Sequence, residues 1–283
     1  MKLNNKNAEI YIPDGKNERE AIAKTTHMAI SAHQDDIEIM AYDGVLKCFG
    51  SKNNNFAAVV VTNGAGSPRN GIYAEYTDEM MQEVRRVEQK KAAFIGEYSS
   101  LVLMDYTSGE VKDPDNDTVT EEITQLLLEA QPEVIYTHNP ADKHDTHVAV
   151  TAKVIAAIRA LPKDKRPKKV FGGEVWRGLD WMCDSDRLAF DVDYYPNMAS
   201  ALLEVFDSQI SGGKRYDLAT VGRRLANATY AASHATDTSQ SLSFAMDLTP
   251  LIRDDSLGIK DFVMGYLKNF EDEVSERIDK FSL

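Results

Sequence analysis

The sequence of 283 residues is long enough for one large α/β domain with a sizeable core. Its 43% hydrophobic and 27% charged residues are typical of a soluble globular protein. The formal net charge of -13 disfavours nucleic acid and anionic membrane surfaces as main partners, because both would repel the chain. A small anionic substrate stays compatible with this charge, since a local pair of arginines can override the global field.

The composition favours neither export nor membrane insertion. Residues 1–14 are polar and lack the apolar core of a signal peptide. No later run approaches the roughly 20 apolar residues of a membrane span. The two cysteines, Cys48 and Cys183, are too few for a disulfide framework and lack metal-type spacing. We therefore expect a cytoplasmic protein without a membrane span.

Strand and helix patterns alternate along the first part of the chain. Residues 1–24 are predicted to form an N-terminal extension, and a first strand begins near Met28. The alternation favours a three-layer, Rossmann-like α/β fold, in which a mostly parallel sheet carries helices on both faces. Further strands are predicted at residues 56–62, 101–104, 133–137 and 170–175. Helices are predicted between them, from Thr77 to Gly96 and over residues 145–160. A third helix is predicted to begin at a capping-box pattern of Thr118 and Glu121 and to end at Ala130.

The pattern loosens after Trp176. Helices are predicted at residues 198–210, 216–232 and 261–281, the last with apolar residues at helical spacing. We expect residues 177–283 to form a looser, helix-rich part that completes the same domain. No repeat, low-complexity segment or linker requires a second domain, so the whole chain is predicted to be one domain.

Residues 28–40 combine the end of a buried strand with the start of an amphipathic helix, whose apolar stripe runs over residues 37–45. His33, Asp35 and Asp36 lie at the junction. In an open parallel sheet this junction is the carboxyl edge, where ligands bind. One imidazole and two carboxylates there favour a metal, although a carboxylate at this position also caps a helix.

A second polar cluster, Thr-His-Asn-Pro-Ala-Asp-Lys-His-Asp-Thr-His, occupies residues 137–147 after the fourth strand. Three of the six histidines fall here, together with Asp142 and Asp145. His144 and His147 are three residues apart and share one face of a helix. A catalytic zinc ion takes three protein ligands of this kind and keeps one position for water. A metal-free, solvated capping cluster is the alternative, but two such loops at sheet edges favour a metal site.

These motifs resemble those of the PIG-L/LmbE-like zinc-dependent N-deacetylases. Ala-His-Gln-Asp-Asp at residues 32–36 is similar to the family's Ala/Pro-His-x-Asp-Asp signature. Asp-x-His-x-x-His at residues 142–147 is similar to its Asp-x-His-Pro-Asp-His signature. Residues 83–88, followed by two alanines, resemble a family helix that carries Arg-x-x-Glu. The resemblance covers about residues 25–210 in the expected order, and it implies the same α/β fold.

The resemblance implies a role for each matching residue. His33, Asp36 and His147 match the zinc ligands, and Asp35 matches the general base. His144 matches the residue that stabilises the oxyanion and protonates the leaving amine. Without the resemblance, the residues themselves do not decide which of the two aspartates takes the metal.

Two positions near these motifs stay open. Arg85 matches a position near the substrate pocket, but the neighbouring Arg86 leaves that choice open by one residue. At Thr146 the family usually has an aspartate, which would raise the pKa of the neighbouring catalytic histidine. Asp142 or Asp145 can compensate for that loss, and we include Asp142 among the candidate catalytic residues.

The implied activity is the removal of an N-acetyl or other N-acyl group from an N-acetylglucosamine-type conjugate. The implied cofactor is Zn²⁺, or another divalent ion such as Fe²⁺, and the implied partner is a small amino-sugar conjugate. Related proteins are often homo-oligomers. Two alternatives remain: a non-haem iron oxygenase with a triad of His33, Asp35 and His147, and a catalytically silent sugar-binding family member. The absence of a Gly-x-Ser-x-Gly motif disfavours a serine hydrolase.

Two further segments are predicted at the same sheet edge. The glycine-rich residues 63–71 lack the dinucleotide-binding fingerprint and are predicted to form a mobile, substrate-facing loop, with a plain surface loop as the alternative. Trp176 and Trp181 follow the fifth strand, where an indole ring can stack on a sugar or pack against the C-terminal helices. Arg69 and Arg85 are candidate anchors for an anionic aglycone.

Overall fold

The computed structural model describes residues 2–282. Its centre is an eight-stranded sheet in the order β1-β4-β3-β2-β5-β6-β8-β7. The central strands β4, β3, β2, β5 and β6 are parallel, whereas β1, β8 and β7 run antiparallel to their neighbours. The strands are β1 (Glu9–Tyr11), β2 (His27–Ser31), β3 (Phe56–Thr62), β4 (Ser100–Tyr106), β5 (Val134–His138), β6 (Lys169–Gly173), β7 (Leu188–Asp191) and β8 (Leu242–Asp247).

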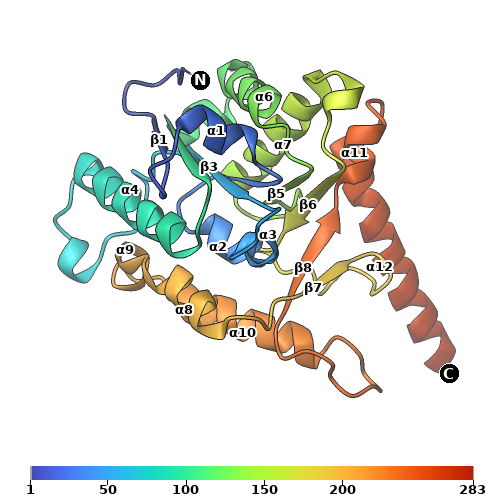
Figure 1. Ribbon diagram of the computed structural model, residues 1–283. Coiled ribbons are helices and arrows are strands. Elements are labelled where there is room, and N and C mark those ends of the chain that lie inside the picture. Colours follow the sequence, from blue (N-terminus) through green and yellow to red (C-terminus); the bar gives the residue numbers. More distant parts are fainter. Residues whose placement is uncertain (1, 283) are drawn as a thin grey trace.

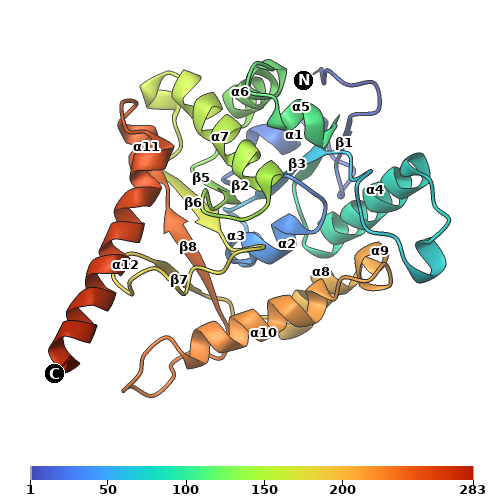
Figure 2. The same ribbon diagram turned by 180° about the vertical axis from the view of Figure 1, so that it is seen from behind.

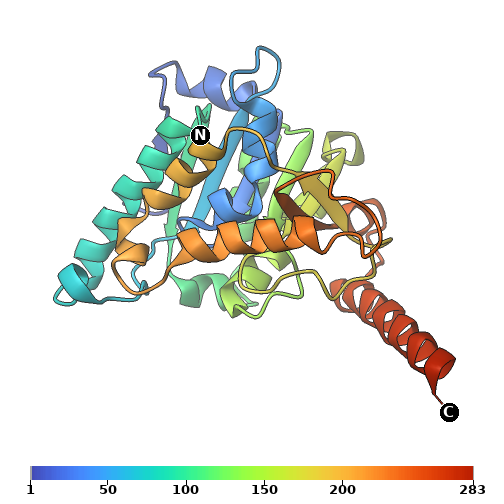
Figure 3. The same cartoon turned by 90° about the horizontal axis from the view of Figure 1, so that it is seen from below.

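Helices cover both faces of this sheet (Figures 1 and 2), which confirms the predicted mostly parallel α/β fold. One face carries α1 (Glu18–Ala23), α5 (Ser108–Lys112), α6 (Thr118–Ala130), α7 (Asp145–Ala160) and α11 (Thr249–Arg253). The other carries α2 (Asp36–Met40), α3 (Tyr42–Cys48), α4 (Asp78–Ile95), α8 (Pro196–Glu204), α9 (Asp207–Ile210) and α10 (Tyr216–Thr229). The last helix, α12 (Ile259–Phe281), projects from the body (Figure 3). Short 3₁₀ helices span Gly71–Tyr73 and Lys163–Lys165.

The strand side chains build two cores, one on each face of the sheet. In β2, Met28 and Ile30 belong to the core under α6 and α7, while Ala29 belongs to the core under α3 and α4. This division follows from the alternation of side chains along a strand. Because both faces are covered, every residue of β3 is buried, as its continuous apolar run predicts.

The ends of the chain add strands that the sequence patterns do not reveal. Residues 1–24 are more than an extension, because β1 pairs with β4 and Ile22 of α1 lies in the core. The C-terminal part is not purely helical either, since β8 joins β6 and carries β7 as the edge strand. These strands have 3 to 6 residues, which is too short for a clear hydrophobic period in the sequence. Only their pairing with neighbouring strands identifies them.

Two local predictions are also wrong. The apolar stripe over residues 37–45 is divided between α2 and α3 at Ala41, whose φ of -119° and ψ of 19° are not helical. The helix α6 begins after Asp117 without a side-chain cap, because the Thr118 hydroxyl bonds to Asn116 instead. A capping box is found at α5, between Thr107 and Glu110.

The parallel strands deliver the candidate residues to one edge of the sheet. The turn after β2 carries His33, Asp35 and Asp36, and the segment after β5 leads to His144 and His147 at the start of α7. β2 and β5 are neighbours in the sheet, so these two loops lie side by side. No helix among residues 2–282 is long and apolar enough to cross a membrane.

A buried polar network below this edge contains an ionisable group. Glu38 of α2 is 1% exposed, and its Oε1 accepts hydrogen bonds of 2.8 Å from Gln89 and from the Tyr98 hydroxyl. Its Oε2 has no hydrogen-bond partner. Burial raises the pKa of Glu38 to about 7 against the opposing effect of these hydrogen bonds. The folded protein therefore holds a proton on Glu38 that the unfolded chain releases near pH 4.5.

We expect the substitution Glu38→Gln to remove a pH-dependent loss of stability. The raised pKa makes the free energy of unfolding fall as the pH rises from 4.5 to 7, on the order of 3 kcal/mol in total. Urea unfolding at several pH values should show that the free energy of unfolding of the variant rises relative to that of the wild type as the pH increases over this range. The exposed Glu75→Gln serves as the control. Parallel stability profiles for the wild type and Glu38→Gln would contradict the assignment.

Candidate metal centre

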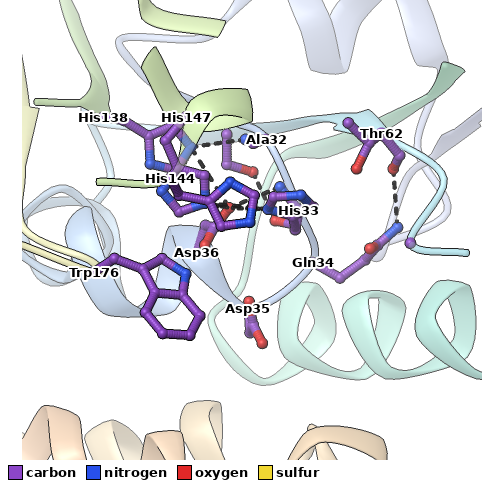
Figure 4. Close-up of polar contacts among 12 residues, drawn as sticks. Ala32, His33, Gln34, Asp35, Asp36, Thr62, His138, His144, His147 and Trp176 are labelled. Carbon is purple, nitrogen blue, oxygen red and sulfur yellow. Dashed lines mark hydrogen bonds and ion pairs between the residues drawn. The ribbon is translucent and has the colours of Figure 1, made fainter. Parts of the chain in front are cut away.

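Imidazoles from two loops surround one carboxylate oxygen (Figure 4). Oδ2 of Asp36 lies 3.2 Å from Nδ1 of His33, 3.4 Å from Nε2 of His147 and 3.5 Å from Nε2 of His138. The same oxygen accepts a hydrogen bond of 2.7 Å from the backbone N–H of His33. The structure therefore brings together the two loops that the sequence predicts to meet.

Three of these atoms have the spacing of metal ligands. Nδ1 of His33 lies 3.1 Å from Nε2 of His147, which completes a nearly equilateral triangle with Oδ2 of Asp36. Ligand atoms around a tetrahedral ion with bonds of about 2.0–2.1 Å lie about 3.3 Å apart. Two imidazoles and a carboxylate suit Zn²⁺ and Fe²⁺. We call these three atoms the donor triangle, and they fit a divalent cation.

His138 lies beside the triangle, and the sequence does not single it out. It is close enough to Asp36 and His147 to belong to a metal group. However, its Nε2 accepts a hydrogen bond of 2.8 Å from the backbone N–H of Ala32, so that lone pair is occupied. Burial and the neighbouring His147 hold the pKa of His138 well below its usual value. The neutral ring stacks on His147 at 3.9 Å between centroids and supports it from behind.

Asp142 orients the second loop. Its Oδ2 lies 3.4 Å from Nδ1 of His147, which fixes the tautomer that turns the Nε2 lone pair toward the donor triangle. The carboxylate also accepts hydrogen bonds from the backbone N–H groups of His144 and Trp176, at 3.1 and 3.2 Å. Although burial opposes it, Asp36 and Asp142 raise the pKa of His147. The geometry makes Asp142 a positioning residue.

The two adjacent aspartates point to different partners. The carboxylate of Asp36 lies among the imidazoles, whereas that of Asp35 lies toward α4 (Figure 4) and forms an ion pair of 3.2 Å with Arg85. Asp35 has a φ of 82°, and its backbone N–H bonds to the Gln89 side chain at 3.1 Å. Such a left-handed conformation is unfavourable for a residue with a Cβ and is found where a site requires it. The triad of His33, Asp35 and His147 is therefore not assembled.

Their surroundings move the pKa values of the two aspartates in opposite directions. Burial raises the pKa of Asp35 to about 7, with Arg85 opposing and Asp36 adding to the shift. Burial would raise the pKa of Asp36 too, but His147 and His138 outweigh it and lower that pKa. Asp36 is thus a permanent carboxylate, and Asp35 exchanges its proton near neutral pH.

Arg85, and not Arg86, faces the site. Arg85 is 2% exposed, donates to the backbone carbonyl of Gln34 and lies 3.4 Å from the Glu88 carboxylate. Arg86 points the other way and donates to the backbone carbonyl of Asn7 at 2.6 Å. Arg85 therefore ties α4 to the turn that carries both aspartates.

The ring of His144 stacks on His147 at 4.5 Å and contacts His33 at 4.9 Å between centroids. Its Nδ1 is buried and has no hydrogen-bond partner. Thr146 is buried too and supplies no charge, and Asp142 bonds to the backbone of His144. Burial, with His147 and His33 nearby, lowers the pKa of His144 to about 4. The imidazole is therefore neutral at physiological pH.

A cavity of about 390 Å³ opens onto the donor triangle. Of the predicted site residues, His33, Asp36, Arg85 and His144 line it. Asp35, Asp142 and His147 are buried and lie behind this wall. The ion site therefore has one side that faces a space large enough for a small molecule.

The remaining wall comes from segments far apart in the sequence. The glycine-rich loop contributes Gly64, Gly66, Ser67 and Pro68, and Trp176 also lines the cavity, so both predicted segments reach it. Gly64 has a φ of 77°, a conformation that favours glycine, and a Cβ there would lie 2.6 Å from Oε1 of Gln34. Arg69 is no anchor, because it bonds to Asp78 and to a backbone carbonyl of its own loop. The wall residues that the sequence analysis missed are Ser108, Lys112, Gln209, Lys214 and Tyr216.

These missed residues carry no local signal of function. Ser108 and Lys112 belong to α5, and the others lie on α9, on α10 and in the turn between them. The helix α9 packs against α4, where Ser208 donates hydrogen bonds of 2.7 and 2.6 Å to the Glu88 carboxylate. This tertiary contact fixes the segment that contains Gln209, which lines the cavity.

Comparison with known proteins gives a family match for part of the chain. Residues 28–158 match the family described as PIG-L: GlcNAc-PI de-N-acetylase, which confirms the resemblance predicted from the sequence. The match contains the complete donor triangle and Asp35, Arg85 and His144. No curated protein matches the sequence of the chain.

Several solved structures share the fold. The chain is similar to N,N'-diacetylchitobiose deacetylase from Pyrococcus horikoshii, with a TM-score of 0.63, 12% identity and coverage of 81% of this chain and 86% of that one. It is similar to 4-carboxy-2-hydroxymuconate hydratase from Pseudomonas putida, with a TM-score of 0.57, 14% identity and coverage of 79% and 96%. A zinc-inhibited form of teicoplanin deacetylase gives a TM-score of 0.55, 14% identity and coverage of 79% and 97%. At these identities the likeness shows the fold alone.

We expect Thr146→Asp to raise the pKa of His144, because a nearby carboxylate stabilises the imidazolium. In the wild type, NMR titration of the metal-free protein should show that His144 stays neutral down to about pH 5, given its pKa of about 4. Thr146→Asn, which has the same shape without the charge, is the control. An unchanged midpoint in Thr146→Asp would show that position 146 does not reach the ring.

Proposed function

We propose that this protein is a metal-dependent N-deacetylase that acts on an N-acetylglucosamine-type conjugate; the match of residues 28–158 to the PIG-L family supports this proposal. The observation that carries the proposal is the donor triangle of His33, Asp36 and His147, with sides of 3.2, 3.4 and 3.1 Å, at the wall of a cavity. The fold by itself does not select this chemistry, since a hydratase is among the solved structures that share it.

His33, Asp36 and His147 would hold the ion, either Zn²⁺ or another divalent metal such as Fe²⁺. A divalent ion bound there lowers the pKa of a water molecule and polarises the substrate's amide carbonyl. Asp142 keeps His147 in the ligating tautomer, and His138 packs behind it. These two residues therefore maintain the site without contacting the substrate.

Asp35 acts as the general base in this proposal. Its pKa of about 7 suits a group that takes a proton from water near neutral pH and gives it up again. The ion pair with Arg85 and the bond from its backbone N–H to Gln89 hold Asp35 in place. Arg85 also lines the cavity, so the base lies directly behind the wall that the substrate contacts.

His144 stabilises the oxyanion by donating a hydrogen bond and delivers the proton to the departing amine. The C–N bond breaks as the nitrogen receives that proton, which yields acetate and a free amine. Because the pKa of His144 is about 4, its ring is neutral before the reaction. The proton that Asp35 takes from water passes to the His144 ring, and the imidazolium formed in this way gives it to the departing amine, so the protons balance over one turnover.

The finer assignments from the sequence remain proposals. Cytoplasmic location, a homo-oligomeric state and the choice of an acetyl group over other acyl groups are of this kind.

We expect the purified protein to release acetate from N-acetylglucosamine conjugates only with a divalent ion bound. Chelation should abolish turnover, and Zn²⁺ or Fe²⁺ at stoichiometric concentration should restore it. The ion should also raise the melting temperature, because it binds the folded state alone; an excess of 100 Kd corresponds to about 2.7 kcal/mol. Because a zinc-inhibited form of teicoplanin deacetylase is known, acetate release should also be measured at increasing Zn²⁺ concentrations above one equivalent.

The same assay separates the alternatives. Oxygen consumption with Fe²⁺ and no acetate would support the oxygenase. Binding of the sugar conjugate without acetate release, in protein with a stoichiometric metal content, would support the catalytically silent family member. Either result would overturn the proposed hydrolysis.

Substitutions of Asp35 and Asp36 should have different effects on turnover and metal content. We expect Asp35→Asn to lower kcat by about 10²- to 10⁴-fold with the metal content unchanged, because the base is lost and the ligands remain. Asp36→Asn should lose the metal, measured by atomic absorption, along with activity. The exposed Asp115→Asn is the control. Metal loss in Asp35→Asn alone would reverse the two roles.

A further inference from the structure

The helix α2, which carries the candidate metal ligand Asp36, is too short to hold its own position. It spans five residues, Asp36–Met40, and the chain leaves the helical conformation at Ala41. A helix of this length is marginal in water, because it makes few internal hydrogen bonds for the residues that it fixes. The orientation of α2, and with it the place of Asp36 in the donor triangle, therefore depends on contacts with other elements.

One of these contacts comes from Arg224 of α10, a helix that lies across the face of the sheet that carries α2 (Figure 3). Its Nη2 donates hydrogen bonds of 2.8 and 3.1 Å to the backbone carbonyls of Glu38 and Ile39. The last carbonyl groups of a helix lack a partner within the helix, and a cation is favourable at that end. Arg224 therefore holds the C-terminal end of α2, while Asp36 lies at its N-terminal end.

Arg224 is a buried cation. It is 5% exposed, and its guanidinium carbon lies 4.8 Å from the ring centroid of Tyr42, the first residue of α3. Within residues 2–282 no carboxylate forms an ion pair with it. Burial lowers the pKa of Arg224 to about 10, although Tyr42 and Glu174 oppose the shift, so the group is charged at neutral pH. A buried cation is often less stabilising than an apolar side chain of similar volume, so this one indicates a role beyond filling space.

The preceding residue, Arg223, contacts the other side of the metal centre. Its Nη1 donates a hydrogen bond to the backbone carbonyl of Val175. The backbone N–H of the next residue, Trp176, donates to the Asp142 carboxylate at 3.2 Å. The same carboxylate oxygen lies 3.4 Å from Nδ1 of His147 and orients that ring. Arg223 therefore holds the segment that supports the second imidazole of the donor triangle.

We propose that Arg223 and Arg224 are positioning residues of the metal centre, through which one helix, α10, fixes both halves of the donor triangle relative to each other. The inference rests on the proposed function, because it concerns the metal centre that this function requires. A metal ion needs its ligand atoms within about 0.2 Å of the ideal distances, so a small shift of either half weakens binding. Supporting residues that are held rigidly provide this accuracy.

Neither arginine belongs to the cavity wall described above. Both act through the backbone of other segments, at Glu38, Ile39 and Val175, and neither contacts the donor triangle directly. We therefore expect their loss to weaken metal binding and to lower kcat, with KM for the substrate of the metal-loaded protein unchanged.

The first test measures zinc affinity in the purified protein by competition with a chelator of known affinity. We expect Arg224→Met and Arg223→Met each to bind Zn²⁺ about tenfold more weakly than the wild type, an effect typical of residues that orient metal ligands. Arg19→Met, at an exposed position of α1, is the matched control and should keep the wild-type affinity. A merely structural role would lower the melting temperature and leave the zinc affinity of the folded variants unchanged, and that result would overturn the proposal.

The visible absorption of bound Co²⁺ supplies a second readout, since its bands depend on the arrangement of the ligands around the ion. The bands of Arg224→Met and Arg223→Met should differ in position or intensity from those of the wild type, and the bands of Arg19→Met should not. Wild-type spectra in both α10 variants would overturn the proposal.

Arg224→Lys provides a milder change if Arg224→Met does not fold. Lysine keeps the charge and has three N–H donors, but its ammonium group does not reproduce the planar geometry of the guanidinium group. Its zinc affinity should lie below that of the wild type and above that of Arg224→Met. Wild-type affinity in both Arg224→Lys and Arg223→Met would overturn the proposal.

The zinc and Co²⁺ measurements need no substrate, so they separate this proposal from the proposed function. Unchanged zinc affinity in the α10 variants, with acetate release by the wild type, would overturn the positioning role and leave the deacetylase intact. Tenfold weaker zinc binding in the variants, with no acetate release by the wild type, would support the positioning role and overturn the deacetylase.

Discussion

One oxygen atom, Oδ2 of Asp36, holds the functional edge of this protein together. It accepts a hydrogen bond from the backbone of His33 and lies within 3.5 Å of imidazoles from both loops. A buried carboxylate is costly unless charges or donors surround it. Here the backbone N–H of His33 donates to it, and the neighbouring His147 lowers its pKa. The contact joins segments more than 100 residues apart, so it also determines how the loop after β2 meets the start of α7.

The helix α4 packs against the turn that carries Asp36 and holds it through buried polar side chains. Its Arg85, Glu88 and Gln89 are all buried, and they connect Asp35, Glu38 and the α9 segment into one polar network. The network holds Asp35 in its left-handed conformation and pairs its carboxylate with Arg85. Two adjacent aspartates can therefore take different tasks, one as a metal ligand and one as a base. Both residues are buried aspartates, and their pKa values differ because Asp36 lies beside His147 and His138 whereas Asp35 lies beside Arg85.

The cavity combines the donor triangle with a wall that distant segments of the chain build. The donor triangle favours a group that an ion can polarise, such as an amide carbonyl. Trp176 offers an apolar ring face 6.1 Å from the ring of His144 and 5.1 Å from Nζ of Lys214. Lys112 and Gln209 line the same cavity.

The sequence alone determined the alternation of strands and helices, the resemblance to the PIG-L family, and the clustering of His33, Asp36 and His147. Local patterns suffice for these, because periodicity and motif spacing are properties of neighbouring residues. Tertiary structure decided the rest. The short strands β1, β7 and β8 exist through their partners, and the choice between Arg85 and Arg86 depends on which face of α4 packs on the site. Lys112, Gln209 and Lys214 share a cavity only because distant elements pack together, and no local pattern records such contacts.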